Sequence, residues 1–158
     1  MPSASALYAC DRNWWHAWHA QACRTCEGAE FWTCNREASR IYDLHFIDSE
    51  AGGGFSKRPG TIRQGGNSGF QALALALHFG AARVVLLGYD MQHGPGKQKH
   101  WHADHGGKLH NPQPANLRAW PIAFAQLARQ TQTPIVNATR ETALQCFPRI
   151  DLADALAG

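Results

Sequence analysis

Three imidazoles and a carboxylate lie within six consecutive residues of this sequence, His100-Trp101-His102-Ala103-Asp104-His105. Side chains of these types, placed this close together, can bind a divalent ion such as Zn²⁺ and activate a water molecule on it. The alternative is that they are polar loop residues that contact a ligand or solvent. Five of the nine histidines fall between His93 and His110, so the candidate chemistry is concentrated in this segment.

The H-x-H-x-D-H spacing resembles the metal-binding signature of the metallo-β-lactamase fold. It therefore supports one hypothesis for the function, a metal-dependent hydrolase built on His100, His102, Asp104 and His105. That fold needs further histidine ligands downstream, and none occurs after His110. An unrelated divalent-metal site fits the sequence better than that fold, and polar loop residues remain the first expectation. Asp90 and Asp104 are the candidate metal ligands, and for such carboxylates Mg²⁺ or Mn²⁺ is expected before Zn²⁺.

A glycine-rich turn, Gly65-Gly66-Asn67-Ser68-Gly69, precedes an expected helix. The free backbone N–H groups and the positive dipole end of a helix N-terminus attract phosphate, and glycines let the phosphate approach closely. The glycine and lysine spacings of the Walker loop and of the dinucleotide fingerprint are absent. The alternative is a tight turn followed by an ordinary N-cap.

Two aspartates follow expected strands. Gly88-Tyr89-Asp90 comes directly after an apolar segment, and Asp11 ends the short apolar run of residues 6–10. Ligands of open α/β sheets bind outside the carboxyl ends of the strands, so Asp90 could hold a metal or a ligand hydroxyl, and Asp11 is a further candidate for ligand binding. Gly88 permits a sharp turn there. The alternative is that Asp90 only caps its loop.

The elements that must position these residues alternate between strand and helix. Residues 67–79 predict a helix that is apolar nearly all round and therefore buried between layers, ended by Gly80. Residues 83–87 (RVVLL) show no polar alternation, which predicts a central parallel strand covered on both faces. Further strands are expected at 6–10, 30–34, 43–47 and 133–137, helices at 13–26 and 117–130, short helices at 139–144 and 151–156, and a long loop at 48–66. Pro121 would lie in the first turn of the helix at 117–130.

Composition sets limits on the class of protein. A chain of 158 residues predicts a single domain, residues 1–158, with a mainly parallel sheet. A net charge of +3 without a basic cluster gives no indication of nucleic-acid binding. No apolar run is long enough to span a membrane. The first residues lack the pattern of a signal peptide, and five cysteines, an odd number, favour a reducing cytoplasm over a disulfide framework.

The stretch GGNSGFQALALALHFGAARVVLLGYDMQ, followed by KHWHADH, resembles the 6-hydroxymethylpterin diphosphokinase-like superfamily, which includes the motility-associated flagellar glycosyltransferases. Bacterial sialyltransferases carry a similar Ser-Gly helix and G-x-D strand end. The similarity is greatest to a short form from phages and prophages, and it extends to YACDRNWW, IVNATRETAL and FPRIDL.

This resemblance implies a Rossmann-like α/β domain with helices on both faces of the sheet. It implies that Gly66, Asn67, Ser68 and Gly69 lie at the phosphate or sugar of a nucleotide, with Asp90 and His100 lining the same pocket. The implied chemistry is glycosyl transfer from a nucleotide sugar or pyrophosphoryl transfer from ATP, in the cytoplasm of a bacterial host. In the first reaction His102 or His105 would protonate a leaving phosphate or activate an acceptor hydroxyl; in the second Asp90 would hold Mg²⁺.

The chain departs from the superfamily at its start, because MPSASALYACD matches the second strand and no G-x-G-P-S-like loop precedes it. A trimmed reading frame, a non-catalytic binding or virion-associated module, and a subunit completed by a homo-oligomer or by a partner chain all remain open. Whether the protein is an active enzyme is left open with them.

Overall fold

The computed structural model describes residues 4–94, 96, 109, 111 and 113–157, and within them short strands alternate with helices. The elements are β1 (Ala6–Tyr8), α1 (Arg12–Thr25), β2 (Glu30–Thr33), α2 (Arg36–Tyr42), β3 (His45–Phe46), β4 (Asp48–Glu50), β5 (Thr61–Arg63), α3 (Ser68–His78), β6 (Val84–Leu86), α4 (Pro114–Ala128), β7 (Ile135–Asn137) and α5 (Leu152–Ala157). The expected α/β class is therefore confirmed.

Within the described residues all strand pairs are parallel, but they form three small sheets instead of one continuous sheet. Their orders are β1-β2-β3, β4-β5 and β6-β7. Each ladder is only two or three residue pairs long, as in the pairing of Val84 with Ile135 and of Leu86 with Asn137. Ladders this short supply few hydrogen bonds, so packing of side chains against the helices must provide much of the stability.

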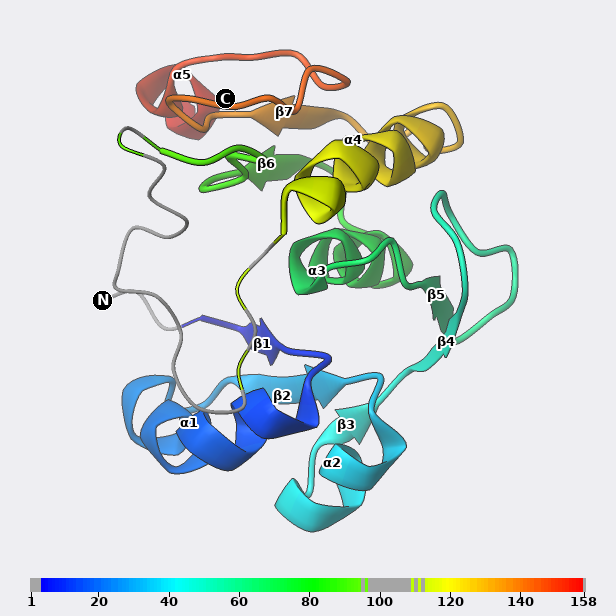
Figure 1. The fold of residues 1–158 in the computed structure, drawn as a ribbon, viewed down its shortest axis with the longest axis vertical. Helices are drawn as coiled ribbons and strands as arrows, with labels where there is room; N and C mark the ends of the chain where they lie inside the picture. The colour runs from blue at the N-terminus through cyan, green and yellow to red at the C-terminus, as the bar shows by residue number, and fades with distance from the viewer. Residues whose placement is uncertain (1–3, 95, 97–108, 110, 112, 158) are drawn as a thin grey trace.

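The sheet β1-β2-β3 is covered by helices on both faces (Figure 1). Alternate strand residues face opposite sides: Leu7 and Phe31 pack with the cluster of Ala9, Trp15, Ala38 and Leu44 beneath α1 and α2. Tyr8 and Trp32 instead pack against the larger core that includes α3.

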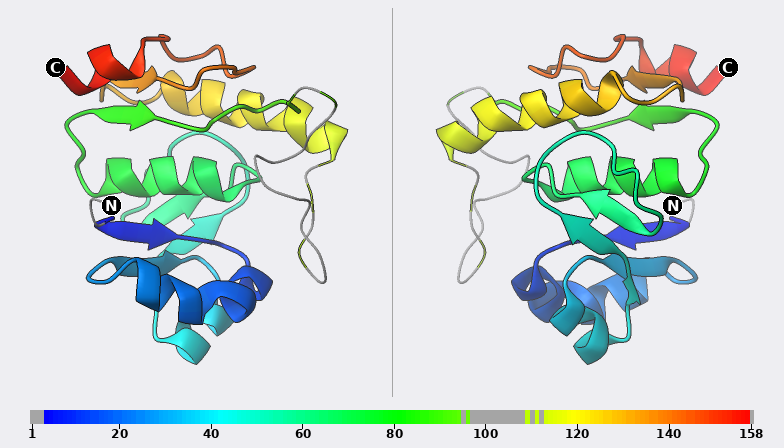
Figure 2. Two further views of the ribbon diagram at one scale, coloured as in Figure 1. Left: turned by 90° about the vertical axis from the view of Figure 1, so that its left-hand side faces the viewer. Right: turned by 90° about the vertical axis from the view of Figure 1, so that its right-hand side faces the viewer.

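Helix α3 lies between the sheet β1-β2-β3 and the pair β6-β7 in all three views (Figures 1 and 2). It matches the predicted buried helix, since Phe70, Leu73, Ala74 and Leu75 are all at most 3% exposed. The same core contains Phe124 and Leu127 of α4, Ile135 of β7, and Leu144 and Phe147 from the segment that follows. One hydrophobic core around α3 therefore connects the sheet β1-β2-β3 with the pair β6-β7.

The expectation that residues 83–87 form a central strand is wrong for the described part of the chain. Strand β6 pairs with β7 alone, Val84 and Val85 are half-buried, and Leu87 is 59% exposed. Strand β1 likewise has one neighbour, β2. The apolar sequence of β6 thus lies at a sheet edge that no described strand covers.

Four other expectations need correction. Helix α2 lies between the strands expected at 30–34 and 43–47, in a segment for which no helix was expected. Strands β4 and β5 lie inside the expected loop at 48–66. Helix α4 begins at Pro114, three residues before the expected start, so Pro121 is in its interior. Residues 139–144 are not helical, because Asn137 and Thr142 bind the backbone of this segment: Thr139 N–H donates to Asn137 Oδ1 (3.0 Å) and Leu144 N–H to Thr142 Oγ1 (2.9 Å).

In the part of the chain that the structure describes, no helix combines the length and the apolar character needed to cross a bilayer.

Candidate functional site

The glycine turn before α3 is fixed by packing. Gly65 and Gly66 have φ angles of +56° and +85°, which glycine adopts most readily. A Cβ at Gly65 would lie 2.0 Å from Cδ1 of Phe70, and one at Gly66 would lie 3.0 Å from the indole ring of Trp120. The tight-turn interpretation therefore accounts for both glycines without a ligand, and evidence for a site must come from their surroundings.

The carboxyl ends of β1 and β6 meet at the N-terminus of α3. Cys10, two residues beyond β1, contacts Ser68: its N–H donates to Ser68 Oγ at 3.4 Å, and its Sγ lies 3.1 Å from the same atom. Tyr89, three residues beyond β6, donates its hydroxyl to the carbonyl of Gly69 at 2.9 Å. The structure thus brings together the predicted turn and the predicted strand end, two segments about twenty residues apart.

The N-cap of α3 carries an unpaired donor. Asn67 Oδ1 accepts from the N–H of Phe70 at 2.8 Å, which is the usual capping bond. Its Nδ2 is buried and has no partner among the described residues. Buried polar groups are nearly always paired, because an unpaired donor loses its hydration without compensation. The free donor at a helix N-terminus therefore marks a position suited to an acceptor atom, in particular an anionic one.

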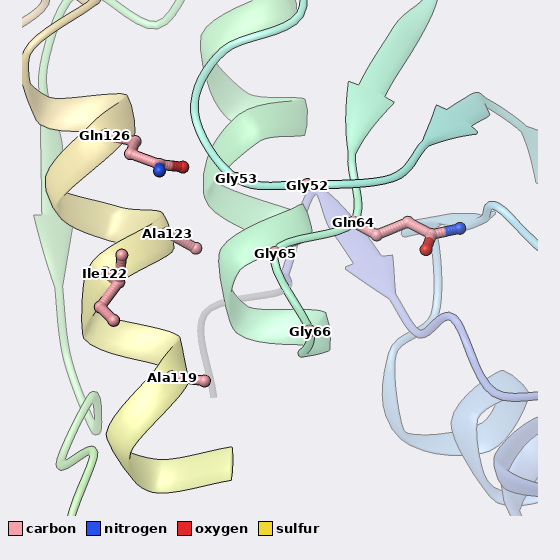
Figure 3. A pocket seen from close by; sticks show the side chains of 9 residues that line it. All are labelled: Gly52, Gly53, Gln64, Gly65, Gly66, Ala119, Ile122, Ala123 and Gln126. Atoms are coloured by element: carbon pink, nitrogen blue, oxygen red, sulfur yellow. The ribbon is translucent and has the colours of Figure 1, made fainter. Parts of the chain in front are cut away.

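A cavity of about 390 Å³ opens beside this turn, between two loops and α4 (Figure 3). Its volume is within the range of small-molecule sites. The walls combine glycine backbone, two side-chain amides and apolar groups: Gly52, Gly53, Gln64, Gly65, Gly66, Ala119, Ile122, Ala123 and Gln126. None of the described residues that line the cavity has a charged side chain.

The loop wall of this cavity was not predicted. Gly53 packs directly on α4, since a Cβ there would lie 2.6 Å from the Cα of Ala123. The three consecutive glycines at positions 52–54 were the available signal, because such a run permits close approach of backbone to a neighbouring helix.

The three other described candidates differ in role. Gly88 has φ +78° and makes the sharp turn expected of it. Asp90 is exposed, its carbonyl accepts from Ala143 N–H at 2.8 Å, and its carboxylate makes no hydrogen bond or ion pair with a described residue. Asp11 caps α1, its Oδ1 accepting from Asn13 N–H at 2.7 Å.

The residues of the histidine cluster, His100, His102, Asp104 and His105, lie outside the described residues. His93, at the start of that segment, is described, and its Nε2 is buried without a partner in the described part of the chain. Within these same limits, no group of three or more His, Cys, Asp or Glu side chains is arranged to hold a metal ion.

Three side chains that contact the first turns of α3, those of Tyr89, Tyr8 and Cys10, are uncharged at neutral pH, whereas the Asp11 carboxylate lies close enough to Cys10 to contribute, besides burial, to the rise in its pKa. Burial raises the pKa of Tyr89 to about 12. Burial also raises the pKa of Tyr8, whose hydroxyl donates to Gln71 Oε1 at 3.0 Å, and the pKa of the Cys10 thiol. These groups act as neutral hydrogen-bond donors, so nothing among them repels an anion.

The sequence matches no protein-family model, and neither the curated proteins nor the solved structures searched include a match to it.

Proposed function

We propose that this protein binds a nucleoside phosphate or a nucleotide sugar, with a phosphate group at the N-terminus of α3, and acts as a transferase of the glycosyltransferase type. The observation that carries the proposal is the buried, unpaired Nδ2 of Asn67 at the N-cap of this helix. The N–H groups of Ser68 and Gly69, in the first turn, are two further donors that the helix itself cannot satisfy.

The arrangement of strands supports this position for the ligand. Strands β1 and β6 point the same way (Figure 2), and their carboxyl ends both lie at the start of α3. We take the sheets β3-β2-β1 and β6-β7 as the two halves of a Rossmann-like, doubly wound arrangement. In such folds the ligand binds where the two halves diverge, outside the carboxyl ends of the strands.

The cavity beside the turn would hold the uncharged part of the ligand. Gly65 and Gly66 line it, and the next residue is the N-cap Asn67. The amides of Gln64 and Gln126 can each donate and accept hydrogen bonds, as recognition of a nucleobase requires. Ala119 and Ile122 provide apolar contact for a planar ring.

The group transfer itself is assigned to the loop after β6. The resemblance to the diphosphokinase-like superfamily places His100, His102 and His105 there, and an imidazole can protonate the leaving phosphate. The carboxylate of Asp90, unpaired among the described residues, is of the type that holds Mg²⁺ or Mn²⁺, with Asp104 as a second candidate. Such an ion would neutralise phosphate charge.

Calorimetric titration with CMP, UDP, GDP and ATP, with and without Mg²⁺ or Mn²⁺, tests the proposal. We expect saturable binding of at least one of them. Heat from none of the four would contradict the proposal, whereas binding without turnover on any acceptor would support a non-catalytic binding module. Stoichiometric zinc in protein purified without added metal would favour the hydrolase.

The variant Asn67→Asp separates ligand binding from folding. Aspartate caps helices as well as asparagine does, but its second oxygen would replace the buried, unpaired Nδ2, so we expect the free energy of unfolding to fall by about 1–3 kcal/mol, which leaves a folded protein for the titration. The donor becomes an anionic acceptor, so nucleotide affinity should fall at least about tenfold. Asn35→Asp is the matched control, because Asn35 caps α2 through the same bond to Ala38 N–H (2.9 Å). Equal affinity of the two variants would contradict the assigned phosphate position.

A further inference from the structure

Two cysteines occupy equivalent positions at the ends of neighbouring parallel strands. The register of β1 and β2 pairs Ala6 with Glu30 and Tyr8 with Trp32. The ladder continues one residue further, since Ala9 N–H donates to the Trp32 carbonyl at 3.2 Å. Two positions beyond the last pair of the ladder, Tyr8 and Trp32, the same register places Cys10 opposite Cys34.

Both thiols face the same side of the sheet. Tyr8, Trp32 and Cys34 pack against the core that contains α3. Cys10 Sγ lies 3.1 Å from Ser68 Oγ on that helix, so it is on the same side. Ala9, which lies between Tyr8 and Cys10 in sequence, faces the opposite side of the sheet and belongs to the cluster under α1 and α2.

The spacing of paired strands is compatible with a disulfide at this register. Neighbouring strands lie about 4.8 Å apart, and the Cα atoms of a disulfide lie roughly 4.4–6.8 Å apart. The two thiols also influence each other: after burial and the bond to Ser68, the proximity of Cys34 is the next cause acting on the pKa of Cys10, which is raised. Both residues are partly exposed, and both have free thiols in this structure.

We propose that Cys10 and Cys34 form a dithiol pair that closes to an intramolecular disulfide by exchange with a small-molecule disulfide. The thiolate of one cysteine attacks a sulfur of the reagent, forming a mixed disulfide and releasing one thiol. The second thiolate then attacks the protein sulfur of the mixed disulfide and releases the second thiol. One reagent disulfide is reduced to two thiols, and the protein loses two hydrogens.

The closed disulfide would change the surroundings of the α3 N-terminus. Cys10 would no longer carry the S–H group that lies against Ser68 Oγ. We therefore expect oxidation to lower the affinity for nucleotide. This expectation about affinity rests on the proposed function, whereas the disulfide itself does not.

Thiol exchange on the chain of residues 1–158 tests the pair. The reduced protein is equilibrated with mixtures of reduced and oxidised glutathione, quenched by alkylation, and analysed by intact mass and peptide mapping. We expect a loss of two hydrogens and a cross-linked peptide that joins Cys10 to Cys34. Stable glutathione adducts on these residues without a cross-link, or no reaction at either residue, would overturn the proposal.

The chain offers a matched control in Cys23 and Cys26, which are three residues apart at the end of α1. The double variant Cys23→Ser, Cys26→Ser should still form the cross-link, while Cys34→Ser should not. A cross-link confined to Cys23 and Cys26 in the wild-type protein would overturn the proposal even if a serine variant fails to fold. Titration of the reduced and the oxidised protein with nucleotide then separates the two proposals, since a confirmed cross-link without binding in either form refutes only the proposed function.

Discussion

At the scale of single residues, the turn before α3 shows how glycine serves packing. The ring of Phe70, which is fully buried, occupies the space where a side chain at Gly65 would be. Gly80 has a similar positive φ of +78°, yet a Cβ there would meet nothing within 4 Å. A side chain at Gly80 would cause backbone strain alone, whereas one at Gly65 would cause strain and a steric clash with Phe70. Substitutions at the two positions therefore distinguish the two costs.

We expect Gly80→Ala to lower the free energy of unfolding by about 1 kcal/mol, the cost of a left-handed alanine. Gly65→Ala should cost at least about twice as much, because displacement of Phe70 adds an overpacking penalty. Urea denaturation at neutral pH measures both values. Equal values would show that Phe70 moves aside without cost.

The raised pKa of Tyr89 predicts that the free energy of unfolding falls at alkaline pH. Its pKa is raised by burial from 10 in the unfolded chain to about 12 in the folded protein. Below pH 10 the hydroxyl is protonated in both states, and its contribution is complete. Between pH 10 and 12 the unfolded state releases the proton first, so stability falls with rising pH, by about 2–3 kcal/mol in all.

The variant Tyr89→Phe should lack this part of the alkaline decline, although loss of the bond to Gly69 makes it about 1 kcal/mol less stable at pH 7. Urea denaturation at several pH values between 9 and 12 measures the decline. Parallel curves for the two proteins would mean that Tyr89 ionises as easily in the folded state as in the unfolded one.

At the scale of elements, α4 contains a proline where helices disfavour it. Pro114 is at the first position, where its missing N–H is not needed. Pro121 is in the interior, where it removes a hydrogen bond and crowds the preceding turn. The sequence pattern placed the start of this helix at residue 117, because the apolar periodicity becomes clear only there.

We expect Pro121→Ala to raise the free energy of unfolding by about 1–3 kcal/mol, since an interior proline costs roughly 3 kcal/mol relative to alanine. Pro114→Ala is the matched control and should change stability little. Thermal denaturation followed by circular dichroism at 222 nm compares the two. A destabilised Pro121→Ala protein would show that the neighbouring elements are fitted to the bend of this helix.

The elements predicted correctly from sequence are those with a long periodic pattern or strong end signals. Helix α3 has eleven residues, an Asn cap and a glycine stop, and its position matched the prediction closely. Strand β5, three residues long, has too few residues to show alternation. Helix α2 was missed although Asn35 caps it. The glycine turn and the strand end were predicted from sequence as site candidates, and they are adjacent in the structure. The cavity was not predicted, because its second wall comes from residues far apart in the chain.

At the scale of the whole molecule, the divided sheet is the main departure from expectation. In β6 the N–H of Val84 donates to the Pro134 carbonyl at 2.9 Å, and the Leu86 carbonyl accepts from Ala138 at 2.9 Å. In a parallel ladder alternate residues point away from the partner strand. The N–H of Val85 therefore faces the open edge.

Hydrogen exchange of individual amides tests the divided sheet. We expect the amide of Val85 to exchange at least about tenfold faster than those of Val84 and Leu86, because opening of the β6-β7 ladder must precede exchange only for the latter. Nuclear magnetic resonance on labelled protein resolves the three. Equal protection would show that a further segment pairs with this edge.

The shared core around α3 has a consequence for synthesis on the ribosome. Phe70 and Leu73 are synthesised well before Leu144 and Phe147, which cover the same core from a later part of the sequence. The nascent chain must hold an uncovered apolar helix until Leu144 and Phe147 have been synthesised. We therefore expect stalled ribosomes that display residues 1–110 to recruit chaperones, and that this recruitment ends once residue 147 has left the exit tunnel.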